Sequence, residues 1–267
     1  MVTSLGSQVN SPVQYQLPLD DELIPLTPYI GKNIKLKYVG DIHCVECGRK
    51  TSKSYNQGFC FPCFKSLAKC DMCIMKPETC HYHEGTCREP EWGEEFCMMP
   101  HYVYLANSSG IKVGITRGTQ IPTRWIDQGA SEALPIFKVS SRLLSGKLEM
   151  VIKNHVSDRT DWRKMLKGSP EHVDLAAKRD ELIKAAAEEI KQIEKDFGQS
   201  EIELLNEKQI NIEFPVENYP EKVKSLNFDK TPEIEGVLQG IKGQYLILDS
   251  GVLNIRKFGG YLVEFSA

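Results

Sequence analysis

Several features that would place the chain in a common class are missing from its sequence. No stretch approaches the roughly 18 consecutive apolar residues that a membrane-spanning helix needs. Residues 1–20 have no basic segment followed by an apolar run, so we expect no secretory signal. The net charge is −3, without the overall positive charge that favours nucleic acid. We therefore expect a cytoplasmic protein in a reducing compartment, with no membrane contact.

Cysteine is absent from most of the chain but abundant in one segment. All nine cysteines lie between Cys44 and Cys97. An odd number in a reducing compartment does not predict a disulfide framework, whereas paired spacings are typical of metal ligands. Three C-x-x-C pairs within 30 residues make scattered buried thiols a poor explanation.

The first two pairs predict one structural zinc ion. Cys44, Cys47, Cys60 and Cys63 form two C-x-x-C knuckles separated by twelve residues. Four thiolates complete the tetrahedral shell that zinc prefers and leave no open position for a substrate. An iron–sulfur cluster is the alternative.

The remaining candidates predict a second zinc site and outnumber the four ligands that the ion needs. We expect Cys70, Cys73, Cys80 and Cys87 as ligands, with His83 as the alternative and His81 also within the segment. Interleaved pairing with the first four cysteines is an alternative arrangement. Cys97 and His101 stand four residues apart and are also candidate ligands, although such residues are more often part of the core.

Charge is unevenly distributed after the cysteine-rich segment. Residues 101–168 hold eleven Lys and Arg against five Asp and Glu. Residues 169–235 hold nine Lys and Arg against seventeen Asp and Glu. A basic excess of this size fits an ordinary solvated surface and is also compatible with phosphate binding.

Apolar periodicity and turn residues predict the main elements. One strand is expected to start at Asn33, and a hairpin is expected from strands over 102–106 and 111–115. A further strand is expected over 137–140. Residues 235–265 are expected to form a small antiparallel sheet that pairs with the strand from Asn33. Helices are expected between Pro122 and Gly129, from Ser145 as N-cap, and from Ser169–Pro170 to Gly198. The Pro-, Ser- and Gln-rich residues 1–30 predict an irregular arm.

An ordered set of motifs in the basic stretch resembles the GIY-YIG nuclease superfamily. The motifs are Tyr102-Val-Tyr-Leu-Ala-Asn, Ile111-Lys-Val-Gly-Ile-Thr, Arg124-Trp125, Leu148-Glu149 and Trp162. With the cysteine-rich residues 70–93, the chain also resembles an uncharacterised bacterial family in which a zinc-rich region precedes a GIY-YIG-like part. The resemblance implies a nucleic-acid-binding protein that cleaves phosphodiesters of DNA or RNA with Mg²⁺ or Mn²⁺.

The resemblance also assigns roles to single residues. Glu149 matches the metal-binding glutamate, Arg124 the phosphate-contacting arginine, and Tyr104 the tyrosine that positions water; Lys112 stands where many members have a second tyrosine. Gly114 would let the backbone approach the pocket closely. No residue clearly matches the terminal asparagine of many active members, although Asn154 and Asp161 lie in that region.

The expected fold class is α+β, in four parts. These are an N-terminal arm (1–32), a strand plus zinc-binding module (33–100), a GIY-YIG-like α/β domain (101–168), and a long helix with a C-terminal antiparallel β segment (169–267). Two alternative functions fit the same residues. One is a non-catalytic nucleic-acid-binding module, and the other is a protein-interaction scaffold built from the zinc module, the acidic helix and the β segment. Taken alone, Glu149 and Lys153 also fit an exposed ion pair on one helix.

Overall fold

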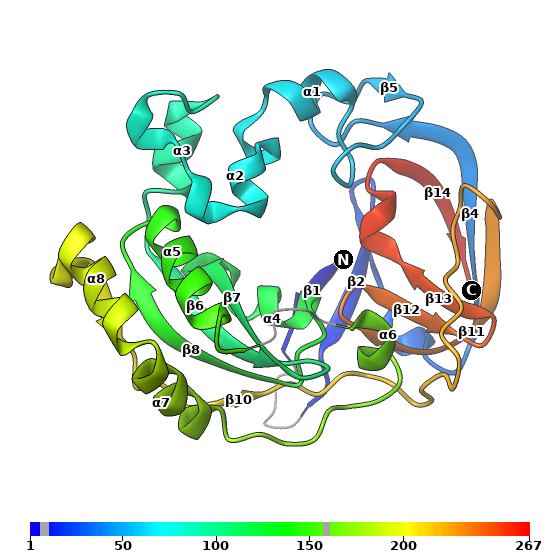
Figure 1. The fold of residues 1–267 in the computed structure, drawn as a ribbon. Coiled ribbons are helices and arrows are strands. Elements are labelled where there is room, and N and C mark those ends of the chain that lie inside the picture. Colours follow the sequence, from blue (N-terminus) through cyan, green and yellow to red (C-terminus); the bar gives the residue numbers. More distant parts are fainter. Residues whose placement is uncertain (6–10, 157–160) are drawn as a thin grey trace.

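The protein combines helices with three antiparallel sheets in a computed structural model that describes residues 1–5, 11–156 and 161–267 (Figure 1). The cysteine-rich segment, residues 44–97, runs along the top of Figure 1. It connects the sheet that contains β4 with the sheet that contains β6. Within the described ranges, no helix combines the length and the apolar character that crossing a membrane requires.

The largest sheet joins residues from both ends of the chain. Its strands, in sheet order, are β13 (Gly251–Asn254), β12 (Tyr245–Leu248), β11 (Glu233–Lys242), β4 (Asn33–His43) and β14 (Tyr261–Ser266), with β5 (Lys50–Thr51) beside β4. Ile34 and Leu36 of β4 are buried and lie opposite Gly236 and Ile234 of β11. The expected C-terminal antiparallel sheet, and its pairing with the strand from Asn33, are therefore confirmed.

Residues 1–5 and 11–30 are not the irregular arm that the composition of this region predicted. They contain β1 (Val2–Ser4), β2 (Gln14–Leu19) and β3 (Glu22–Pro25), which form a sheet in that order. Tyr15 and Leu17 alternate inward along β2 and are buried. Pro18 is tolerated because β1 pairs only with Gln14–Gln16, so Pro18 has a neighbour strand on one side.

The middle sheet carries the predicted hairpin. Its order is β10 (Ile210–Asn211), β8 (Glu132–Val139), β6 (His101–Asn107) and β7 (Ile111–Arg117), with β9 (Ile202–Leu204) also paired to β8. The hairpin β6–β7 confirms the two predicted strands, and β8 extends the third strand toward its N-terminus. One face of this sheet contributes to the core shared with the other two sheets, and the other face packs against helices.

Helix α5 (Arg142–Lys153) covers the second face, but it begins earlier than the sequence indicated. Ser141, not Ser145, is the N-cap, and its hydroxyl accepts from the Leu144 amide. Ser145 is buried and donates its hydroxyl to the Arg142 carbonyl. Its neighbour Gly146 touches the backbone of residues 77–78, so small residues are needed where the helix meets the cysteine-rich segment.

The long helix expected from Ser169 is two helices that begin later. They are α7 (Leu175–Ala185), capped by Asp174, and α8 (Ala187–Phe197), which ends at Gly198 as predicted. The chain after Ser169–Pro170 is irregular up to the Asp174 carboxylate, which accepts from the Ala177 amide and starts α7.

The remaining helical segments are short. They are α1 (Phe61–Ser66), α2 (Met72–Met75), α3 (Pro90–Phe96), α4 (Thr123–Asp127), α6 (Trp162–Met165), and the 3-10 segments η1 (Thr27–Tyr29), η2 (Ala68–Cys70), η3 (Pro77–Thr79), η4 (Tyr82–Glu84), η5 (Gly118–Gln120), η6 (Gln199–Glu201) and η7 (Ile255–Phe258). Helix α4 lies in the stretch between Pro122 and Gly129 where a helix was expected.

Candidate metal centre and candidate catalytic site

The first four cysteines converge on one point. Strand β4 ends at His43, so Cys44 begins the turn that carries Cys47. Cys60 immediately precedes α1, and Cys63 lies in its first turn. The four sulfur atoms all lie within 4.8 Å of one another, and those of Cys47 and Cys60 are 3.8 Å apart.

The backbone around this cluster holds the knuckles in place. The Cys44 amide donates to the Arg49 carbonyl, and the Gly48 amide donates to the Cys44 carbonyl. Gly48 has a φ of +68°, a left-handed conformation that costs glycine little. The second knuckle is tied to the first because the Val45 amide donates to the Gly58 carbonyl at 2.9 Å.

The electrostatics of the cluster favour a bound cation. Burial disfavours the Cys44 thiolate, but amides of Cys47, Cys60 and Glu46 stabilise it more strongly and lower the Cys44 pKa to about 6. The pKa of Cys63 is raised, chiefly because its thiol donates to Cys60. One thiolate among closely packed thiols is an arrangement that a metal ion completes by replacing the protons. The four-cysteine cluster therefore fits a structural zinc ion, with no ligand position left open.

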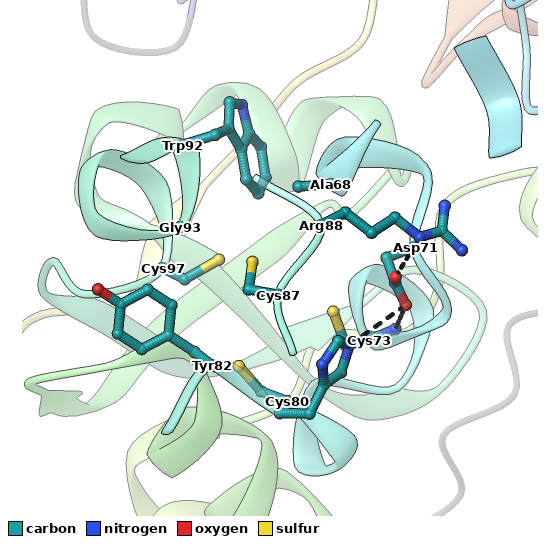
Figure 2. Close-up of a pocket in the computed structure, with 11 residues that line it drawn as sticks. Ala68, Asp71, Cys73, Cys80, Tyr82, Cys87, Arg88, Trp92, Gly93 and Cys97 are labelled. Carbon is teal, nitrogen blue, oxygen red and sulfur yellow. Dashed lines mark hydrogen bonds and ion pairs between the residues drawn. The ribbon is translucent and has the colours of Figure 1, made fainter. Parts of the chain in front are cut away.

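The structure brings together only some of the ligands that were expected for the second zinc ion. Cys73, Cys80 and Cys87 line one cavity, and Cys97 lines it with them (Figure 2). Cys70 is buried at the end of η2 and does not line this cavity, and neither does His83. Since the first cluster contains only cysteines of the first set, the two sets are not interleaved.

His101 contributes nothing to this cavity, although its spacing from Cys97 had made it a candidate ligand. Its ring is fully buried, and Nδ1 lies 2.7 Å from the Met99 carbonyl. Burial lowers its pKa to about 4, so the ring is neutral at physiological pH.

Tyr104 and Gly114 face each other across the β6–β7 hairpin. The Tyr104 ring is completely buried, and its hydroxyl accepts from Gln128 Nε2 at 2.6 Å. A Cβ at position 114 would meet the Tyr104 hydroxyl oxygen at 2.6 Å, so Gly114 makes room for this ring. The ring also packs edge-on against Trp125, with 5.9 Å between centroids. Gln128 is a partner that sequence motifs did not indicate.

The other three predicted catalytic residues come from three elements and lie within electrostatic range. Arg124 of α4 and Glu149 of α5 both act on Lys112 of β7, and Arg124 also acts on Glu149. Burial lowers the pKa of Lys112 to about 8; Arg124 adds to this shift and Glu149 opposes it. The Arg124 side chain is exposed, so the cluster opens to solvent on that side.

Glu149 has an acidic neighbour that the sequence did not indicate. Burial raises the pKa of its carboxyl group, Lys153 lowers it, and Glu78 of η3 raises it further. Glu78 reaches this place because η3 packs against α5 at Gly146. No local signal could have found it, because the two glutamates are far apart along the chain.

The two positions considered for the terminal asparagine have structural contacts. Asn154 is the C-cap of α5, and Asp161 is the N-cap of α6, where its carboxylate accepts from the Arg163 and Lys164 amides. Trp162 stacks on Tyr245 of the largest sheet, with 5.5 Å between ring centroids.

Comparison with known proteins places the chain in a family without assigning it a reaction. The family described as "Protein of unknown function (DUF2797)" matches residues 31–263, and the chain belongs to it. No curated protein and no solved structure gives a significant match.

Proposed function

We propose that the protein is a zinc-containing, nucleic-acid-binding nuclease of the GIY-YIG type, which cleaves phosphodiester bonds with Mg²⁺ or Mn²⁺. One observation carries the proposal. Tyr104, Lys112, Arg124 and Glu149, which were selected from sequence motifs alone, come from four separate elements and share one electrostatic environment.

The chemistry of these groups suits a phosphate substrate. The Arg124 guanidinium, exposed beside the buried cluster, offers a planar fork for two phosphate oxygens. Lys112, with its pKa of about 8, offers a positive charge near neutral pH and a proton acceptor at slightly higher pH. The buried Tyr104 hydroxyl accepts a hydrogen bond from Gln128 beside these charged groups.

The two glutamates supply the cation ligands. One carboxylate alone holds Mg²⁺ weakly, because this ion keeps several waters and needs further oxygen ligands. Glu78 raises the pKa of Glu149, and a divalent cation bound between the two carboxylates would remove this repulsion. Substrate phosphate oxygens would complete the shell. The bound cation would polarise the phosphate and neutralise charge that develops during cleavage.

The cysteine-rich segment has a supporting part in this proposal. Zinc at Cys44, Cys47, Cys60 and Cys63 fixes the start of the segment, and contact between Gly146 and residues 77–78 holds its middle against α5. This arrangement places Glu78 of the cysteine-rich segment beside Glu149 of α5.

The test is a cleavage assay on mixed DNA and RNA substrates with Mg²⁺ or Mn²⁺. We expect wild type to cleave, and Glu149→Gln to lose cleavage while keeping its zinc content and circular dichroism spectrum. Glu188→Gln is the matched control, because Glu188 is a highly exposed carboxylate on α8. Cleavage by Glu149→Gln at the wild-type rate would contradict the mechanism.

A second candidate is recognition of nucleic acid without cleavage. The observation that favours it is the complete burial of Tyr104, whose hydroxyl already binds Gln128. This candidate predicts binding that weakens steeply with salt and yields no product with either metal. Replacement of Arg124 by Ala would weaken such binding, whereas Glu149→Gln would strengthen it by removing a negative charge.

A further inference from the structure

Four cysteines from separate turns surround one small cavity. Cys73 lies on α2, Cys80 follows η3, Cys87 precedes α3, and Cys97 follows α3. All four line this cavity and are drawn around it in Figure 2, although their sulfur atoms are not all within 4.8 Å of one another, as those of the first cluster are. The cavity has a volume of about 10 Å³, roughly the room that one water molecule or one small ion needs.

We infer that Cys73, Cys80, Cys87 and Cys97 hold a second structural zinc ion, and that Cys70 is not one of its ligands. Thiolates select zinc over the hard cations, and four of them fill its tetrahedral shell. The inference concerns a separate site and does not depend on the proposed nuclease activity.

Cys70 completes a C-x-x-C pair with Cys73, yet the two side chains have different surroundings. Cys70 ends η2, and its thiol lies beside the side chain of Asn56. Asp71 then caps α2, and Cys73 follows inside that helix. Because the chain changes direction between η2 and α2, the Cys73 side chain lines the cavity and the Cys70 side chain does not.

A rival set of ligand atoms shares Cys73. Asp71, Cys73 and His81 each place one such atom within 4.8 Å of the others. The Asp71 carboxylate, however, is already occupied: it pairs with Arg88 Nε at 2.6 Å and accepts from the Cys73 amide. His81 Nδ1 lies 2.7 Å from the Thr86 hydroxyl. These contacts explain the approach of Asp71 and His81 without a metal ion.

A partly buried cation beside the cavity supplies an independent reason for negative charge there. Arg142 is partly buried, its backbone amide donates to the Cys97 carbonyl at 2.8 Å, and its side chain interacts electrostatically with Cys97 and Cys73. Its Nη2 donates to the Ile74 carbonyl, and its Nε has no partner among the described residues. A buried guanidinium nitrogen without a hydrogen-bond partner is costly, and negative charge nearby reduces that cost. A zinc ion with four thiolates carries a net charge of −2 and would compensate the Arg142 guanidinium.

The test uses the cysteine count of the full chain. Zinc per chain and the absorption of the Co²⁺-substituted protein are measured for wild type, Cys70→Ser and Cys97→Ser. The chain has nine cysteines, so removing Cys70 leaves eight, the number that two tetrathiolate sites require. We expect wild type and Cys70→Ser to bind two ions with the same thiolate-to-Co²⁺ charge-transfer intensity. We expect Cys97→Ser to keep one ion, at the first cluster.

Each result decides the assignment. Two all-thiolate ions in Cys70→Ser require Cys97 as a ligand by count, even if Cys97→Ser fails to fold. Loss of one ion or of charge-transfer intensity in Cys70→Ser would overturn the assignment, as would a Cys97→Ser protein with both sites intact. Nitrogen or oxygen donors at the second Co²⁺ ion of wild type would contradict the four-cysteine assignment and favour Asp71, Cys73 and His81 as the ligands.

Discussion

The buried Lys242 makes the fold sensitive to pH in a way that one substitution can remove. Lys242 lies on β11 with no exposed surface, and its ammonium donates to the Gly168 carbonyl at 2.8 Å. The rings of Phe214 and Tyr219 lie 5.5 and 5.4 Å from its nitrogen. Burial nevertheless lowers its pKa from 10.5 to about 8.

This shift gives the sign and size of the effect. Between pH 8 and 10.5 the unfolded chain binds a proton at Lys242 that the folded chain releases, so the free energy of unfolding rises with pH in that window. Below pH 8 the folded state carries the full cost, about 3 kcal/mol at 1.36 kcal/mol per pKa unit. Lys242→Met removes this cost but leaves the Gly168 carbonyl without its donor, a loss of about 1–3 kcal/mol.

Urea unfolding of wild type and Lys242→Met at pH 7 and pH 10.5 tests the reasoning. We expect the variant to equal or exceed the stability of wild type at pH 7. Between pH 7 and pH 10.5, the free energy of unfolding of the variant should fall by about 3 kcal/mol relative to that of wild type. Lys257→Met, at an exposed position, is the control and should show no comparable pH dependence. A Lys242→Met difference that is the same at both pH values would refute a buried ammonium at this position.

Three further substitutions test single contacts by thermal or urea unfolding. Gly114→Ala should destabilise by about 1–3 kcal/mol, because its Cβ would meet the buried Tyr104 hydroxyl oxygen at 2.6 Å; an unchanged melting temperature would contradict that packing. Gly146→Ala should cost a similar amount, about 1–3 kcal/mol, because its Cβ would meet the Glu78 backbone nitrogen at 2.5 Å; if the proposed function holds, it should also slow cleavage. Ser141→Ala should cost about 1 kcal/mol through loss of the α5 cap, and no loss would mean that the helix starts elsewhere.

The parts of the fold that the sequence predicted well depend on short-range patterns. The knuckles of the first cluster are local, because each C-x-x-C pair places two sulfurs on one turn. The β6–β7 hairpin follows from two β-type runs joined by a glycine-containing turn. Pairing of β4 with β11 was expected only because both segments showed strand patterns and each needed a partner.

The predictions that were wrong concern features that depend on helix capping, on short strands or on packing between residues far apart in the sequence. Ser141 and Ser145 are both acceptable N-caps in sequence, and only the contact of Gly146 with residues 77–78 shows why Ser145 must be inside the helix. The alternation of Tyr15 and Leu17 is too short to outweigh the composition of residues 1–30.

Ligand choice at the proposed second metal site shows the same limit. Spacing ranks Cys70 with Cys73, whereas the turn at Asp71 separates their side chains. Cys97 follows the C-terminal end of α3 and lines the cavity, and no local sequence pattern predicts that position. Glu78 meets Glu149 for a similar reason, since η3 and α5 come together only in the folded chain.

The most direct test of the account is metal analysis with zinc X-ray absorption on the purified wild-type chain. The first cluster brings four sulfur atoms within 4.8 Å of one another and fits a structural zinc ion, so the account predicts bound zinc. We expect zinc with only sulfur neighbours, at about 2.3 Å. Iron in place of zinc, a first shell with nitrogen or oxygen atoms, or a folded chain without metal would contradict the account.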